Sequence, residues 1–134
     1  MYKKILMPVD VFEMDLSDKA VRHAANLAKA EGASITLVNI LPVSGRSLLR
    51  GFNADIKKFE EYMTTESDKK MTALKRLFDI DPDKIECKVR FGSVRDEIIK
   101  MSKEGDYDVI VIGSKNPSIT THLLGSNAES ILRY

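Results

Sequence analysis

The sequence has a single cysteine, Cys87, among its 134 residues, so no disulfide can form within the chain. It has six methionines, and no secretory signal accompanies the apolar stretch in residues 1–9. Proteins of this composition are typical of a reducing compartment, and a chain of this length needs neither a disulfide nor a metal to complete its core. A cytoplasmic location is therefore predicted.

Long apolar runs and an excess of one charge are also missing. The stretch in residues 1–9 is far shorter than the roughly 20 residues of a transmembrane helix and is better explained as a strand. Lys and Arg number 21 against 20 Asp and Glu, and the two signs are interspersed. Neither a nucleic acid nor a membrane is predicted as a partner. No His, Cys and carboxylate cluster has the spacing of metal ligands, so no metal held by side chains is predicted.

The chain is predicted to form one domain, residues 1–134, which can bury roughly two-thirds of its unfolded surface. Short Val/Ile-rich runs predict strands, and periodic apolar positions with capping residues predict helices. Strands are expected at about residues 5–9, 34–41, 85–91 and 107–112, and helices at about residues 17–31, 55–78, 93–105 and from 127 onward.

This alternation of strands and helices predicts an α/β fold, a single doubly wound parallel sheet with helices on both faces. Polar and apolar residues alternate in the 85–91 strand, with Cys87 facing inward, which indicates an edge strand. If the fourth strand lies on the other side of the first, the strand order is 3-2-1-4. Ligands of such sheets bind beyond the carboxyl ends of the strands, where the order reverses.

The loop after the fourth strand contains two glycines, Gly113 and Gly125, which let the backbone approach a ligand closely. Ser126 and Glu129 form a capping-box pattern, so the loop should end at a helix N-terminus with free N–H groups that suit a phosphate. The candidate phosphate-binding residues are Gly113, Ser114, Lys115, Asn116, Gly125, Ser126 and Asn127. A glycine-containing connection to a capped helix, with no ligand, gives the same pattern.

The loop after the first strand is acidic and begins with Asp10. Its carboxylates would repel a phosphate but can accept hydrogen bonds from a base amine or a ribose hydroxyl. We therefore predict that a nucleoside lies on this side of the site, near Val9, Asp10, Asn39 and Ile40. A role for Asp10 as a turn or helix-entry residue stays open.

Four stretches of the chain resemble the universal stress protein family, in its small, single-domain, adenine-nucleotide-binding form. They are KILMPVD at residues 4–10, GSV at 92–94, DVIVIGS at 108–114 and LLGS at 123–126. The resemblance implies that the ligand is ATP, with Mg²⁺ bridging its phosphates, and that the protein is a homodimer. By position, Asp10 and about Ile40 would hold the nucleoside, and the phosphates would lie on Gly113, Asn116, Gly125 and Ser126.

Two features depart from the family pattern G-x2-G-x9-G-[ST]. Asn116 replaces the second glycine, and eight residues, 117–124, stand where the pattern has nine. Asn tolerates a left-handed backbone, whereas Pro117 favours an extended Asn116, so a reshaped phosphate loop is expected. The family's fifth strand is expected to be absent from this chain, which would leave the fourth strand with a bare edge.

The resemblance implies a stress-response protein that binds ATP at the carboxyl ends of the strands and acts as a regulatory or protective protein. The alternative is a dimeric scaffold of the same fold that binds no nucleotide; Gly113 and Gly125 count against it. A receiver domain would need an acceptor Asp after the third strand, where Phe91 and Gly92 stand. No Walker-type loop is present, so at most slow ATP hydrolysis is expected, and no catalytic residue is predicted.

Overall fold

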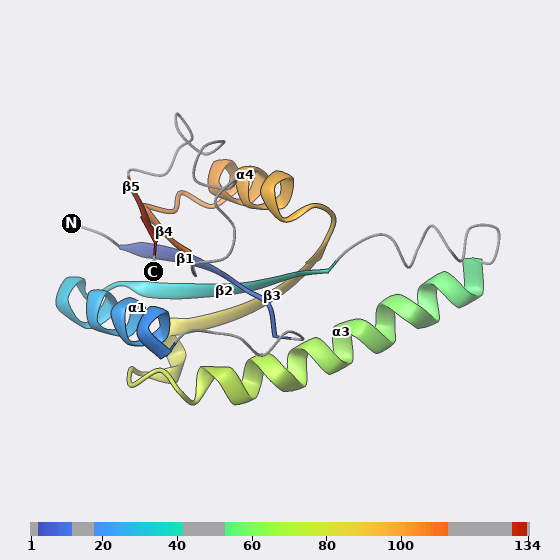
Figure 1. Ribbon diagram of the computed structural model, residues 1–134, viewed down its shortest axis with the longest axis horizontal. Coiled ribbons are helices and arrows are strands. Elements are labelled where there is room, and N and C mark those ends of the chain that lie inside the picture. Colours follow the sequence, from blue (N-terminus) through green and yellow to red (C-terminus); the bar gives the residue numbers. More distant parts are fainter. Residues whose placement is uncertain (1–2, 12–17, 42–52, 113–129, 134) are drawn as a thin grey trace.

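The computed structural model describes residues 3–11, 18–41, 53–112 and 130–133, which form a five-stranded sheet and three long helices (Figure 1). The strands are β1 (Lys4–Val9), β2 (Ser34–Leu41), β3 (Ile85–Phe91), β4 (Val109–Ile112) and β5 (Ser130–Arg133). The helices are α1 (Asp18–Glu31), α3 (Asn53–Lys75) and α4 (Val94–Glu104), with a 3₁₀ turn, η1 (Pro82–Lys84), before β3.

All strand pairs are parallel, and the sheet has the order β3-β2-β1-β4-β5. The predicted order 3-2-1-4 is therefore confirmed, as is the position of β3 at one edge. Helices α1 and α3 cover one face of the sheet and α4 covers the other (Figure 1). Figure 1 also shows the N-terminal end of α3 extending well beyond the end of β2.

The predicted absence of a fifth strand is wrong. Residues 130–133, expected to continue a helix, form β5 in parallel with β4, with Val109 opposite Ser130 and Ile112 opposite Arg133. The short, Val/Ile-rich β4 would otherwise leave a row of backbone N–H and C=O groups unpaired on that side. Pairing with β5 satisfies them, and this tertiary gain outweighs a local capping signal.

Each face of the sheet carries its own apolar cluster because successive side chains of a strand point to opposite faces. The cluster between this sheet and helices α1 and α3 includes Ile5, Met7, Ile35, Leu37, Met71 and Val109. The cluster under α4 includes Leu6, Val38, Ile98, Met101, Tyr107 and Ile110. The ends of the strands are thus held by packing on both sides, which gives the loops at the carboxyl edge a rigid base.

Asp108 ties the start of β1 to the start of β4. Its Oδ2 accepts from the backbone N–H of Lys3 at 2.7 Å and of Lys4 at 3.0 Å. These bonds, that from Lys3 first, lower the pKa of Asp108 below its usual value. A carboxyl with a lowered pKa contributes stability that is present above its unfolded pKa of about 3.9 and is lost as the pH falls through the folded pKa.

We expect Asp108→Asn to lower the free energy of unfolding by about 1 kcal/mol at neutral pH, at the low end for charged hydrogen bonds because water reaches this site. At a pH below the lowered pKa of Asp108, where the carboxyl of the wild type is itself protonated, the two proteins should converge. Urea unfolding at both pH values measures this. A difference that is the same at both would assign the effect to packing instead of charge.

Candidate functional site

The strand order reverses between β1 and β4, at the predicted position. From β1 the chain passes outward to β2 and then β3, whereas β4 lies on the other side of β1. Residues that follow β1, β2 and β4 therefore start from one edge of the sheet. In sheets of this kind, ligands bind in the crevice beyond the carboxyl ends of the strands, at the point where the strand order reverses.

Val9 and Asp10 lie where the sequence predicted, at the end of β1. Val9 is buried under α1 and α3, and Asp10 is exposed directly after it. Val9 lies opposite Asn39 in the register of β1 and β2, which brings the ends of the two strands together. The backbone groups of both strand ends and the Asp10 carboxylate thus belong to one small area of the carboxyl edge.

Asn39 is near this area, but its side chain points under α3. It is 1 % exposed, and its Nδ2 donates to the Ser67 hydroxyl at 2.7 Å. Its Oδ1 has no hydrogen-bond partner among the described residues. Ser67 lies on the inner face of α3, in helical spacing with Met71 and Leu74, and this spacing was the signal that could have marked it as buried.

We expect Ser67→Ala to lower the free energy of unfolding by about 1 to 3 kcal/mol, because it leaves the buried Asn39 amide without its partner. Combining Asn39→Leu with Ser67→Ala should recover most of that loss, since an apolar pair of similar size needs no hydrogen bond. Chemical unfolding of the wild type, both single variants and the double variant gives the coupling energy. Strictly additive losses would show that the Asn39–Ser67 bond contributes nothing.

Ile40 lies on the opposite face of the sheet from Asn39. It packs against the cluster under α4 and stands opposite Arg90 of β3. The next residue, Leu41, accepts a hydrogen bond from the Gly92 backbone N–H at 2.9 Å. The end of β2 is therefore supported by the turn that leads from β3 into α4.

This turn is a second feature at the carboxyl ends of the strands; in the sequence it matches the family at residues 92–94 and lies at the start of a predicted helix. Ser93 caps α4, because its Oγ accepts from the Asp96 N–H at 3.1 Å. Hydrogen bonding with Ser93, followed by that with Arg95, lowers the pKa of Asp96. The helix predicted over about residues 93–105 is confirmed as α4, with Ser93 as its N-cap.

The phosphate-binding residues predicted from the sequence lie outside the described residues. They are Gly113, Ser114, Lys115, Asn116, Gly125, Ser126 and Asn127. The structure describes the chain up to the end of β4 at Ile112, one position before Gly113. Ile112 belongs to the apolar cluster under α4. The loop that carries these residues thus leaves the sheet from the strand beside β1.

Other candidate chemistry is weaker in the described part of the chain. Burial raises the pKa of the Cys87 thiol, which packs against the cluster under α1 and α3, so it is not an activated nucleophile. Residues 3–11, 18–41, 53–112 and 130–133 contain no group of three or more His, Cys, Asp or Glu that could hold a metal ion. None of the helices in these ranges is long and apolar enough to cross a membrane.

A hollow of about 330 Å³ lies at the other end of the sheet, before the first residues of β2 and β3. Its walls are mostly aliphatic, and it is lined by Ala28, Lys29, Gly32, Ala33, Ile80, Asp81 and Lys84. None of the predicted site residues lines it. The polar groups that could recognise a nucleoside are at the carboxyl edge instead.

Solved structures share this arrangement of the whole chain. That of the hypothetical protein MJ0577 of Methanocaldococcus jannaschii superimposes with a TM-score of 0.74 at 20 % identity, over 100 % of this chain and 97 % of that one. A universal stress protein in complex with cAMP gives 0.61 at 17 % identity, over 99 % of this chain and 97 % of that one. The universal stress protein from Archaeoglobus fulgidus in complex with dAMP gives 0.55 at 22 %, over 98 % and 97 %.

Other relatives share a much higher sequence identity with this chain than these solved structures do. Universal stress protein G of Salmonella typhimurium is 54 % identical over 134 residues, which cover 100 % of this chain and 94 % of that protein. The model of the universal stress protein family matches residues 1–134. The chain therefore belongs to the universal stress protein family.

Proposed function

We propose that this protein binds ATP at the carboxyl edge of its sheet and acts in the cytoplasm as a nucleotide-dependent regulatory or protective stress protein. The observation that carries the proposal is that the carboxyl ends of β1, β2 and β4 lie side by side. Val9 ends β1 and Asp10 follows it, and Asn39 of β2 lies opposite Val9. On the other side of β1, β4 stops one residue before Gly113. This gives an acidic group for a nucleoside beside the start of a glycine-containing loop.

The ligands of the related structures support an adenine nucleotide. cAMP and dAMP, bound to two universal stress proteins of the same fold, share an adenine base and one phosphate. In this chain Asp10 would accept hydrogen bonds from the base or ribose, with the backbone at Asn39 and Ile40 completing the nucleoside side. The triphosphate and Mg²⁺ rest on the resemblance of the loop with Gly113 and Gly125 to the family's ATP-binding pattern.

We also propose a homodimer. β5 forms one edge of the sheet, so the backbone groups on its outer side have no partner strand within the described chain. The fifth strand of the family often forms the contact between subunits. At the other edge, β3 carries Glu86, Lys88 and Arg90, charges that discourage pairing. A dimeric scaffold without nucleotide remains the second candidate; the glycines at positions 113 and 125 favour the nucleotide.

We expect Asp10→Ala to raise the Kd for ATP and for AMP by the same factor, about tenfold, since both lose a charge-assisted hydrogen bond worth about 1.5 kcal/mol or more. Asp10→Asn, which keeps an acceptor oxygen, should lose less. Isothermal titration calorimetry with Mg-ATP and AMP measures both constants.

Asp83→Ala is the matched control, because it removes the same charge from an exposed position in η1, before the amino end of β3. It should bind both nucleotides as the wild type does. Equal affinities in Asp10→Ala and Asp83→Ala would remove Asp10 from the site.

A further inference from the structure

The turn between β3 and α4 lies beside the proposed nucleoside site. Its Gly92 donates its backbone N–H to Leu41 O, the residue after Ile40, at 2.9 Å. Leu41 and Phe91 are opposite each other in the register of β2 and β3, so this bond extends the pairing of the two strands by one step. The bond therefore joins the turn at Gly92 to the end of β2.

The side chain of Glu97, from the first turns of α4, lies against Gly92. A Cβ atom at Gly92 would lie 3.1 Å from Glu97 Cγ, 3.2 Å from Oε2 and 3.3 Å from Cδ, so the side chain packs directly on the glycine backbone. Gly92 has φ +150°, a conformation that other residues rarely adopt. The turn thus needs a glycine at position 92, and the Glu97 side chain fills the space beside it.

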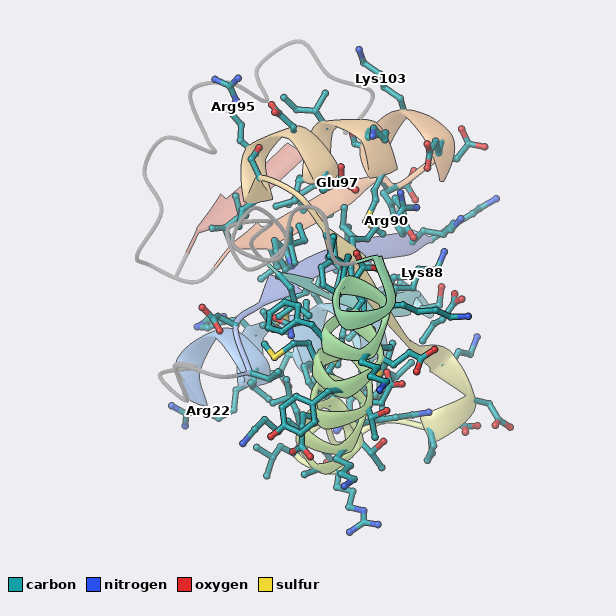
Figure 2. The ribbon with its side chains drawn as sticks, turned by 90° about the vertical axis from the view of Figure 1, so that its right-hand side faces the viewer. Arg22, Lys88, Arg90, Arg95, Glu97 and Lys103 are labelled. Atoms are coloured by element: carbon teal, nitrogen blue, oxygen red, sulfur yellow. The ribbon has the colours of Figure 1, made fainter. Side chains whose placement is uncertain are left out.

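Glu97 is a charged residue that is only 8 % exposed. Its Oε1 lies 3.8 Å from Arg90 Nη1 and its Oε2 lies 3.4 Å from Lys100 Nζ. Arg90 also pairs with Glu104, at 3.2 Å between Nη2 and Oε2. Figure 2 shows Arg90 and Glu97 lying together between α4 and the sheet.

A buried ion pair is weak evidence of stabilisation, because desolvation of the two charges offsets most of their attraction. An apolar pair could hold α4 on the sheet equally well. The two cations instead fix the direction of the Glu97 carboxylate, because Oε1 faces Arg90 and Oε2 accepts a hydrogen bond from Lys100. The neighbours of the Glu97 side chain are Gly92 on one side and Arg90, opposite Ile40, on the other.

We propose that Glu97 is a positioning residue for the nucleoside side of the site. Through Gly92 and the Leu41 carbonyl it sets the position of the β2 end, where the base of the nucleotide would contact the backbone. The inference rests on the proposed function, and it adds a residue from α4 that does not touch the ligand. It predicts that loss of the Glu97 carboxylate weakens recognition of the adenosine part, which ATP and AMP share.

The test compares Glu97→Gln with Glu104→Gln. Each variant removes one negative charge and one carboxylate partner of Arg90, but only Glu97 contacts Gly92. We expect Glu97→Gln to raise the Kd for both Mg-ATP and AMP about tenfold, with Glu104→Gln close to the wild type. A direct charge effect would go the other way, since removing a negative charge favours an anion.

Hydrogen exchange of the Gly92 amide in the absence of nucleotide is the second readout. In Glu97→Gln it should be about tenfold faster than in Glu104→Gln, because the bond to Leu41 opens more often. Titrations are made well below the unfolding temperature, so global stability does not enter. Should Glu97→Gln fail to fold, Arg90→Gln loosens the same carboxylate from its other side and is expected to show both effects.

Faster exchange with unchanged affinities would overturn the inference, as would a loss for ATP alone, which would place the effect at the phosphates. Equal behaviour of Glu97→Gln and Glu104→Gln would overturn it too. If the wild-type protein binds neither nucleotide, the proposed function fails and the positioning role fails with it. That case is recognised from the wild-type titration alone, whatever the Gly92 amide does.

Discussion

Gly125→Val is expected to abolish ATP binding, with a Kd at least about 100-fold above that of the wild type. In the proposed site the backbone at Gly125 approaches the phosphates, and a branched side chain there would displace them. Loss of two hydrogen bonds to a charged group, each worth about 1.5 kcal/mol, corresponds to a change of this size. Calorimetric titration with Mg-ATP measures the constant.

A graded series supplies the control. Gly125→Ala should fall between the wild type and Gly125→Val, and Gly113→Val should lose binding as Gly125→Val does. All of these variants should unfold near the wild-type temperature in the absence of nucleotide, because the added side chain is expected to displace the phosphates of the ligand and not to disturb the protein itself. An unchanged affinity for ATP in Gly125→Val would contradict the assignment of the phosphate loop.

Gly105→Ala is expected to lower the free energy of unfolding by about 2 kcal/mol. Gly105 follows α4 with φ −110°, which any residue can adopt, so the backbone is not the cause. A Cβ there would overlap Tyr107 Cε2 and lie 3.0 Å from Cδ2 and 3.1 Å from Cζ. The Tyr107 ring cannot move aside cheaply, because it is buried and Lys4 Nζ lies 4.8 Å from its centroid.

Two further variants separate the causes. Gly32→Ala introduces a methyl group into open space at φ +65°, so it should cost only about 1 kcal/mol of backbone strain. In a Tyr107→Leu background the added cost of Gly105→Ala should largely vanish, because the overlapping ring is gone. Chemical unfolding of the wild type, Gly105→Ala, Tyr107→Leu and the double variant measures the coupling energy between the two positions. An additive cost would show that contact with Tyr107 is not the reason.

The main elements of the fold could be predicted because their signals are local. β2 and β3 were predicted with their observed bounds, since a continuous apolar run and an alternating run are each typical of one position in a sheet. α1 and α3 begin and end within about three residues of their predicted bounds. The edge position of β3 followed from its alternating pattern, whereas the place of the fourth strand on the other side of the first was a condition of the predicted order.

β5 could not be predicted in this way. Four residues are too few to show a period, and the pattern of Ser126 and Glu129 argued for a helix nearby. A strand at residues 130–133 is favoured by the unpaired edge of β4. β4 lies some twenty positions earlier in the sequence. The information is in the pairing of the two segments and in neither segment alone.

The candidate site was predicted unevenly for the same reason. Val9 and Asp10 occupy the predicted strand end, because their position follows from one local pattern. The direction of the Asn39 side chain depends on Ser67, which is 28 residues away on a different element. The close packing of Glu97 against Gly92 could not be predicted, because the spacing of the two residues in the sequence does not indicate a contact.

Titration of the wild-type protein with Mg-ATP, Mg-ADP, AMP and GTP, followed by thermal unfolding and by mass spectrometry of any nucleotide that copurifies, tests the central claim most directly. ATP at a hundred times its Kd is expected to stabilise the protein by about 2.7 kcal/mol, a shift of several degrees, and GTP should have less effect. No shift with any adenine nucleotide, and no copurified nucleotide, would contradict the claim and favour the scaffold.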